Sequence, residues 1–178
     1  MKKTLLFAVL IAATLFTAVS CASKQPVEED VAAPSQAKIT AMAEEGALDL
    51  SEFQSPDKFA IKYDDDAYTL TCKGPEYLYF DLPEELIPYE TVVTVHMTGV
   101  NNGVEGFRVW IDTGSQKDLS DPVYLGAVGE GLPSGDFDIS FELNANKDVG
   151  GKCLWIKGPR WGTMIDNVVF KSISVVYN

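Results

Sequence analysis

The side chains best suited to chemistry lie on one face of a predicted strand at 105–112. Alternation along an extended chain places Arg108, Trp110 and Asp112 on the same face, opposite the apolar residues between them. An aromatic ring offers a flat surface on which the C–H face of a sugar can pack, and Arg and Asp side chains hydrogen bond to hydroxyl groups. This row predicts a sugar-binding site, unless a loop covers it or it serves only cross-strand pairing.

Two further groups extend the candidate site. Tyr77 and Tyr79 share the outer face of a strand predicted at 77–82 and would lengthen an aromatic platform. Arg160 and Trp161 lie in a loop rich in Gly and Pro, where they could either contact a ligand or cap one end of the core. The predicted ligand-binding residues are therefore Tyr77, Tyr79, Arg108, Trp110, Asp112, Arg160 and Trp161.

Catalysis finds little support in the residue types. The chain has one histidine, His96, which lies inside a predicted strand. No GxSxG, HExxH, CxxC or phosphate-binding glycine motif occurs. The 26 Asp and Glu residues could include a carboxylate pair that meets only in space, but a small domain rarely forms the cleft that such a pair needs. We therefore expect a binding protein rather than an enzyme.

Strands must position these side chains, and strand patterns fill the chain from about residue 58 onward. Short runs rich in β-branched and aromatic residues alternate with Gly, Pro, Asn and Asp, as is typical of β-sandwiches. No segment has the apolar period of an amphipathic helix over ten or more residues. The sequence predicts an all-β fold, a two-sheet antiparallel, jelly-roll-like β-sandwich. Strands are expected at 58–63, 67–73, 77–82, 90–99, 105–112, 122–128, 136–143, 152–157 and 164–177.

Alternation also predicts which face of each strand is buried. The phase slips in the last strand, between Phe170 and Ile173, which indicates a bulge near Lys171 and Ser172. The Asn-Asn-Gly sequence at 101–103 is typical of a hairpin turn, because Asn and Gly accept positive φ. The inward set comprises Leu78, Phe80, Leu82, Val93, Val95, Met97, Phe107, Val109, Ile111, Phe137, Ile139, Phe141, Leu143, Val168, Phe170, Ile173, Val175 and Tyr177.

The first 46 residues are predicted to lie outside the folded domain. Residues 1–20 have the positive start and short apolar run of an export signal. A small residue precedes Cys21, as in a bacterial lipobox, although Ala18 stands where Leu is usual. We expect lipidation of Cys21, the alternative being ordinary export. Residues 21–46 are polar and rich in small residues, which predicts a disordered, flexible tether with at most a short helix at about 36–45. The β-sandwich domain is expected at 47–178.

The net charge of the chain limits its partners. The formal charge is −12, and removal of residues 1–20, which hold two lysines and no acids, makes it −14. Such a surface repels nucleic acid and anionic lipid headgroups and favours neutral or cationic partners. We expect no nucleic-acid partner, and contact with a membrane only through the lipid anchor.

Cys72 and Cys153 remain as a potential disulfide pair in an oxidising compartment. Strand parity opposes the bond, since Cys72 shares an apolar face with Leu70 whereas Cys153 alternates with the apolar Leu154. A bulge near Gly150 would reverse this orientation. The sequence therefore leaves undecided whether Cys72 and Cys153 form a disulfide.

Two stretches resemble jelly-roll carbohydrate-binding modules. The run Glu-Gly-Phe-Arg-Val-Trp-Ile-Asp at 105–112 is similar to their central strand, and 154–158 with 165–175 resembles their C-terminal strands. The resemblance covers roughly residues 55–178. It implies a galactose-binding-like β-sandwich that holds a glycan on a sheet face or in end loops. Such modules often hold a structural calcium ion through an acid on the last strand, a position that Asp166 matches loosely, so the resemblance leaves open whether this chain binds calcium. No other cofactor is expected.

These features predict a non-catalytic, carbohydrate-binding lipoprotein of the bacterial cell envelope, on the periplasmic side or the outer surface. The alternative is an envelope lipoprotein that uses its sandwich for protein–protein contact, as an adhesin or an assembly subunit. Glycan binding requires partly exposed aromatic rings beside polar groups, whereas protein contact requires a broad apolar patch.

Overall fold

The computed structural model describes residues 34–112, 124–128, 131–145, 148–160 and 162–178. These residues form two antiparallel sheets, which confirms the predicted all-β sandwich. Cys21 and the predicted export signal lie outside them. No helix in the described ranges is both long and apolar enough to cross a membrane. The elements are α1 (Gln36–Ala41), the 3₁₀ helices η1 (Leu50–Glu52) and η2 (Lys58–Ala60), and the strands β1 (Ile61–Asp64), β2 (Thr69–Lys73), β3 (Tyr77–Ile87), β4 (Val92–Asn101), β5 (Arg108–Asp112), β6 (Tyr124–Val128), β7 (Gly135–Asn144), β8 (Val149–Lys157) and β9 (Asp166–Tyr177).

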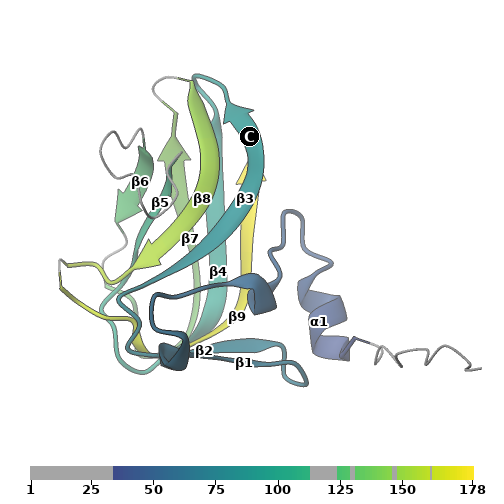
Figure 1. Cartoon of the computed structure of the whole chain (residues 1–178), viewed down its shortest axis with the longest axis vertical. Coiled ribbons are helices and arrows are strands. Elements are labelled where there is room, and N and C mark those ends of the chain that lie inside the picture. Colours follow the sequence, from purple (N-terminus) through teal and green to yellow (C-terminus); the bar gives the residue numbers. More distant parts are fainter. Residues whose placement is uncertain (1–33, 113–123, 129–130, 146–147, 161) are drawn as a thin grey trace, which may run out of the picture. The chain divides into compact units, whose positions relative to one another are not determined.

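The strands form a jelly-roll-like arrangement. Sheet A has the order β1-β2-β9-β4-β7, and sheet B has the order β3-β8-β5-β6. Every neighbouring pair in the two sheets is antiparallel. Figure 1 shows the two sheets packed face to face, and most strands that follow each other in sequence lie in opposite sheets. This order places β8 between β3 and β5, which carry the predicted site residues.

The core lies between the inner faces of the two sheets. In β4 every second residue is buried, and the rings of Phe107, Phe137 and Phe170 meet with centroids 5.5 to 6.0 Å apart. Burial of each such side chain contributes about 1.5–3 kcal/mol to folding. The predicted inward set is buried, except that Ile139 is half-buried and Tyr177, at the end of β9, is 43 % exposed.

A bulge in β9 keeps its two halves facing the core. Gly99 of β4 pairs with Phe170, whereas the residue before Gly99 pairs with Ser172, so Lys171 is skipped. This confirms the bulge predicted near Lys171 and Ser172. A Cβ atom at Gly99 would lie 2.1 Å from the carbonyl oxygen of Val169, so the close approach of β4 to β9 requires glycine at this position.

Most predicted strands differ from the observed ones at one or both ends, and two of these differences have a clear local cause. Residues 58–60 form η2 rather than the start of a strand, because the Asp57 side chain accepts the N–H of Phe59 at 2.9 Å and caps the turn. β3 continues through Pro83 to Ile87. It tolerates the proline because it is an edge strand and because its pairing with β8 shifts register there.

The Asn-Asn-Gly sequence at 101–103 does not form a hairpin, so that prediction is wrong. β4 and β5 lie in different sheets, and the turn carries the chain across the sandwich. The buried Asn101 side chain holds the turn by accepting the N–H groups of Gly103 and Val104 at 3.0 and 2.9 Å. Its Nδ2 donates to the carbonyl oxygens of Val104 and Pro133. A local turn signal does not specify which sheet the next strand joins.

Part of the predicted tether packs on the sandwich. The short helix expected at about 36–45 is present as α1. The chain then pairs with β9, because the N–H of Val175 donates to the Gly46 carbonyl and that of Leu48 donates to the Ile173 carbonyl, both at 2.9 Å. We call residues 36–46 the strap. The disordered tether predicted for 21–46 therefore does not include the strap, whose partners lie far away in sequence.

Cys72 and Cys153 lie in different sheets, and no disulfide joins them. Cys72 of β2 is in the core, where burial and the charge of Asp166 raise the pKa of its thiol to about 12. Cys153 of β8 pairs with Asp81 and Asp112 on the outer face of sheet B. The structure therefore agrees with strand parity, which placed the two thiols on different faces.

Candidate functional site

An in-register row of aromatic side chains crosses the outer face of sheet B. Tyr79 on β3 pairs with Trp155 on β8, and Trp155 pairs with Trp110 on β5. Gly126 on β6 continues the register without a side chain. We call Tyr79, Trp155 and Trp110 the aromatic row. It brings together two predicted ligand-binding residues that lie about 30 positions apart in the sequence.

The rings of the aromatic row pack against one another. The Trp155 centroid lies 6.1 Å from that of Trp110 with nearly parallel planes, at 10°. It lies 5.6 Å from the Tyr79 centroid and 5.2 Å from that of Tyr77. Trp155 is only 4 % exposed, whereas Tyr77, Tyr79 and Trp110 are partly exposed. The row therefore has a buried centre and accessible ends.

The segment around Gln54 pairs with the free edge of β3 and holds Tyr79 in place. Gln54 forms a bridge with Tyr79, with backbone hydrogen bonds of 2.9 and 3.0 Å in the two directions. The Tyr79 hydroxyl also donates to the Gln54 side-chain oxygen at 2.8 Å. The ring of Tyr79 is thereby fixed before any ligand arrives, which lowers the entropy cost of binding.

Arg108 braces a loop beside the row. Its Nε donates to the carbonyl oxygen of Gly158 at 2.9 Å, and a terminal nitrogen donates to the Arg160 carbonyl at 3.5 Å. These bonds fix the β8–β9 loop where it leaves the sheet. Arg108 lies beside the row, as predicted, but part of its donor capacity is used by the protein.

Lys157 and Tyr77 add polar groups on the same side of the row. Lys157 is buried, donates to Glu76 Oε1 at 2.8 Å, and lies 5.8 Å from the centre of the Tyr77 ring. Burial, and then the charges of Glu76 and Tyr79, raise the pKa of Tyr77. Its hydroxyl therefore stays protonated at neutral pH and can donate to a ligand oxygen.

Two acids occupy the opposite side of the row. Asp81 on β3 and Asp112 on β5 both pair with Cys153, so they flank it across the sheet. Asp81 is exposed to solvent, and the side chain of Asp112 lies outside what the structure describes. The aromatic row thus has cationic groups along one side and positions for carboxylates along the other.

The indole nitrogen of Trp155 is a buried donor. Among the described residues, Trp155 Nε1 has no hydrogen-bond acceptor. A buried N–H without an acceptor costs about 1–3 kcal/mol, and buried tryptophan usually finds one. The centre of the row therefore holds an unused donor beneath the partly exposed rings.

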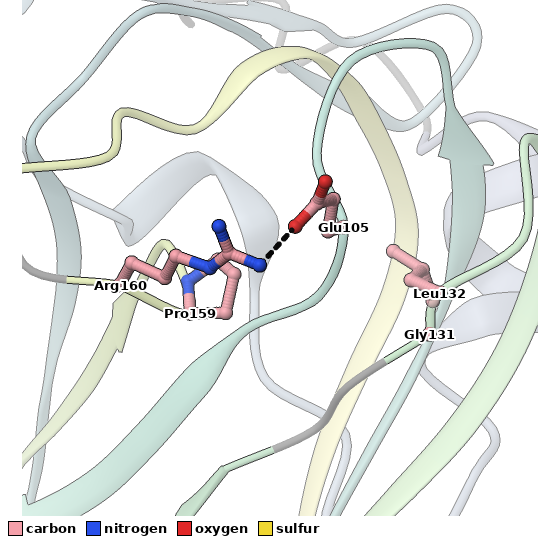
Figure 2. A pocket seen from close by; sticks show the side chains of 5 residues that line it. All are labelled: Glu105, Gly131, Leu132, Pro159 and Arg160. Carbon is pink, nitrogen blue, oxygen red and sulfur yellow. Dashed lines mark ion pairs between the residues drawn. The ribbon is translucent and has the colours of Figure 1, made fainter.

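A second feature is a pocket of about 350 Å³ at one end of the sandwich. Figure 2 shows the Arg160 and Glu105 side chains pointing toward each other across it, and their charged atoms lie 3.1 Å apart. Both side chains are about three-quarters exposed, at 76 and 74 %, so the ion pair contributes little to stability. Trp161 lies outside the described residues. Arg160 thus lines this end pocket. The hydrogen bonds from Arg108 to the carbonyl oxygens of Gly158 and Arg160 join the loop of Arg160 to the sheet. The lining residues are Glu105, Gly131, Leu132, Pro159 and Arg160.

Asp166 lies at the start of β9 and is exposed. Its side chain accepts a hydrogen bond from Asn167 Nδ2 at 3.0 Å. In the ranges that the structure describes, no three His, Cys, Asp or Glu side chains gather in a way that could hold a metal ion. Calcium sites also use backbone carbonyls and water, so calcium at Asp166 stays a prediction.

Trp155 is the residue at the centre of the site that the sequence prediction did not include. Its alternation with the inward Leu154 and Ile156 already indicates an outward side chain. The missing information was the strand order, which places β8 between the two strands that carry the predicted residues. Glu105 was missed as well, because only the fold brings it to Arg160.

Comparisons with known proteins give little further guidance. No protein-family model matches the sequence, and no curated protein matches it. Among solved structures, the chain is similar to CpGH89CBM32-4 of Clostridium perfringens, determined in complex with GlcNAc-α-1,4-galactose. The identity is 13 %, the TM-score is 0.36, and the match covers 76 % of this chain and 98 % of that one. A similarity this low carries no argument about function.

Proposed function

We propose that this protein binds a neutral or amino-sugar glycan on the outer face of sheet B. The observation that carries the proposal is the aromatic row, in which Tyr79 and Trp110 remain partly exposed on either side of Trp155. The C–H faces of sugar rings pack on such aromatic surfaces. The row is held by cross-strand pairing in a rigid sheet, so little order has to be gained on binding.

The polar groups around the row suit hydroxyl-rich ligands. The protonated Tyr77 hydroxyl donates hydrogen bonds, and the exposed Asp81 carboxylate accepts them. The net charge of the chain is −12, which disfavours glycans that carry carboxylate or sulfate groups. Neutral and amino sugars are therefore the classes that this face fits best.

The proposed role is binding without catalysis, in the cell envelope. Lipidation of Cys21 would anchor the protein to a membrane, since several acyl chains together hold a protein firmly. The strap and the sandwich would then lie outside the cytoplasm. Mass spectrometry of the protein purified from bacterial membranes tests the anchor directly, because lipidation adds the mass of its acyl chains at Cys21.

A glycan array tests the proposed function. The array carries neutral, amino-sugar and acidic glycans, and the purified protein is applied at two salt concentrations. We expect signals on neutral or amino-sugar glycans that persist at the higher salt, because stacking on aromatic rings is not screened. The proposal fails if no glycan gives a signal above background, or if only acidic glycans do. The absence of any signal would favour the alternative function, protein–protein contact, whereas signals on acidic glycans alone would contradict the argument from net charge.

A further inference from the structure

His96 sits between two carboxylates on the outer face of sheet A. Its Nδ1 lies 2.7 Å from Glu44 Oε1 of the strap, and its Nε2 lies 2.7 Å from Asp138 Oδ1 of β7. The His96 side chain is 26 % exposed, and that of Glu44 is 37 % exposed. One imidazole ring therefore connects the strap to the sheet, independently of the aromatic row in sheet B.

Both short contacts require the doubly protonated ring. An ionised carboxylate only accepts hydrogen bonds, so each ring nitrogen must donate. A neutral imidazole has one N–H, and its other nitrogen would present a lone pair to a carboxylate. Burial on its own lowers the pKa of His96, but the hydrogen bonds and negative charges of Asp138 and Glu44 outweigh it and raise the pKa above the ordinary value of 6.5.

The strap has few other attachments. Beyond the Val175 N–H bond to Gly46, Lys38 pairs with Asp49 at 2.7 Å, the Tyr68 hydroxyl contacts Met42 at 2.9 Å, and Ser174 donates to Glu44 at 3.4 Å. α1 contains no fully buried residue, and Ala41 packs partly buried against the core. A groove of about 550 Å³ separates the strap from β2, β4 and β9. The His96–Glu44 pair is thus one of a small set of polar contacts that hold the C-terminal half of the strap to sheet A.

We propose that His96 is a proton-dependent clamp that holds the strap on sheet A and releases it when the imidazolium loses its proton. Deprotonation removes the positive charge that faces both carboxylates. The Glu44 contact then loses the attraction between opposite charges, and it loses its hydrogen bond as well when the remaining hydrogen is on Nε2, facing Asp138. Each released residue lets the strap extend up to about 3.5 Å further from sheet A.

The direction of the pH effect follows from the raised pKa of His96. The His96–Glu44 contact stabilises the attached strap fully at pH values below the unfolded pKa of 6.5. This stabilisation is lost as the pH rises through the higher folded pKa of His96. The charged groups around the ring also favour its protonated form. β7 contributes Asp138 and Glu142, and the strap contributes Glu44. From β9, Ser174 donates to Glu44 Oε1 at 3.4 Å, while Lys171 pairs with Asp136. The surroundings of His96 are therefore net acidic and favour the proton.

NMR on the full chain tests the clamp, because His96 is its single histidine and its ring signals need no assignment. We expect His96 to titrate above pH 6.5, and Glu44→Gln to lower that pKa. Between pH 6 and 8.5, amide exchange at Leu48 and Val175, corrected for the intrinsic rate, should rise about fivefold as the clamp opens. These amides report on the strap because Val175 of β9 donates to Gly46 at the end of the strap, and Leu48, two residues further on, donates to Ile173 of β9.

Two variants separate the clamp from a merely structural ion pair. Glu45→Gln removes a neighbouring charge and should leave both readouts as in the unmodified protein. His96→Gln keeps one donor but cannot change charge, so its corrected exchange at Val175 should not depend on pH. If His96→Gln fails to fold, Glu44→Gln provides the same test from the strap. Corrected exchange that stays constant while His96 loses its proton would overturn the proposal.

Discussion

Replacing Phe170 with alanine should lower the free energy of unfolding by about 4 kcal/mol. Phe170 is fully buried on β9, and its ring lies 5.5 Å from that of Phe107 and 6.0 Å from that of Phe137. These three rings join the two sheets, so the truncation leaves a cavity that the rigid strands cannot close. Urea denaturation followed by tryptophan fluorescence measures the loss.

Phe59→Ala is the matched control for this prediction. Phe59 is 94 % exposed, so its truncation should change the free energy of unfolding by less than about 0.5 kcal/mol. A loss below about 1.5 kcal/mol at Phe170 would mean that the core does not close around this ring as described.

Trp110→Ala should weaken binding of the glycan identified on the array by at least about tenfold, or about 1.4 kcal/mol. Trp110 supplies one accessible end of the aromatic row, and alanine removes the surface on which a sugar ring packs. Trp110→Tyr keeps an aromatic ring and should retain most of the affinity. Isothermal titration calorimetry of the three proteins measures the difference.

Arg160→Ala distinguishes the aromatic row from the end pocket. The pocket contains Arg160 and Glu105 but no member of the row, so this variant should bind the glycan with nearly unchanged affinity. If Arg160→Ala abolishes binding and Trp110→Ala does not, the ligand occupies the end pocket instead.

Most of the structural prediction came from the alternation of apolar and polar side chains along each strand. It placed Arg108 and Trp110 outward and Val109 inward, and the phase slip after Phe170 located the bulge that skips Lys171. These features depend on local geometry, because successive residues of a strand face opposite sides. Local sequence therefore specified the buried and outer faces of nearly every strand.

Strand order could not be predicted, and the site depends on it. Trp155 joins Tyr79 to Trp110 only because β8 lies between β3 and β5. The strap escaped prediction for the same reason, since Glu44 meets His96 52 positions away. Composition describes what a segment contains but not which distant surface it will contact.

The most direct test of glycan binding on sheet B is an NMR titration of the indole N–H groups. The chain has three tryptophans, so three separate signals report on the site. With the array-selected glycan, we predict large shifts at Trp110 and Trp155, whose unused N–H lies at the centre of the row, and a small shift at Trp161. Shifts confined to Trp161, or signals that do not move at saturating glycan, would contradict the proposed site.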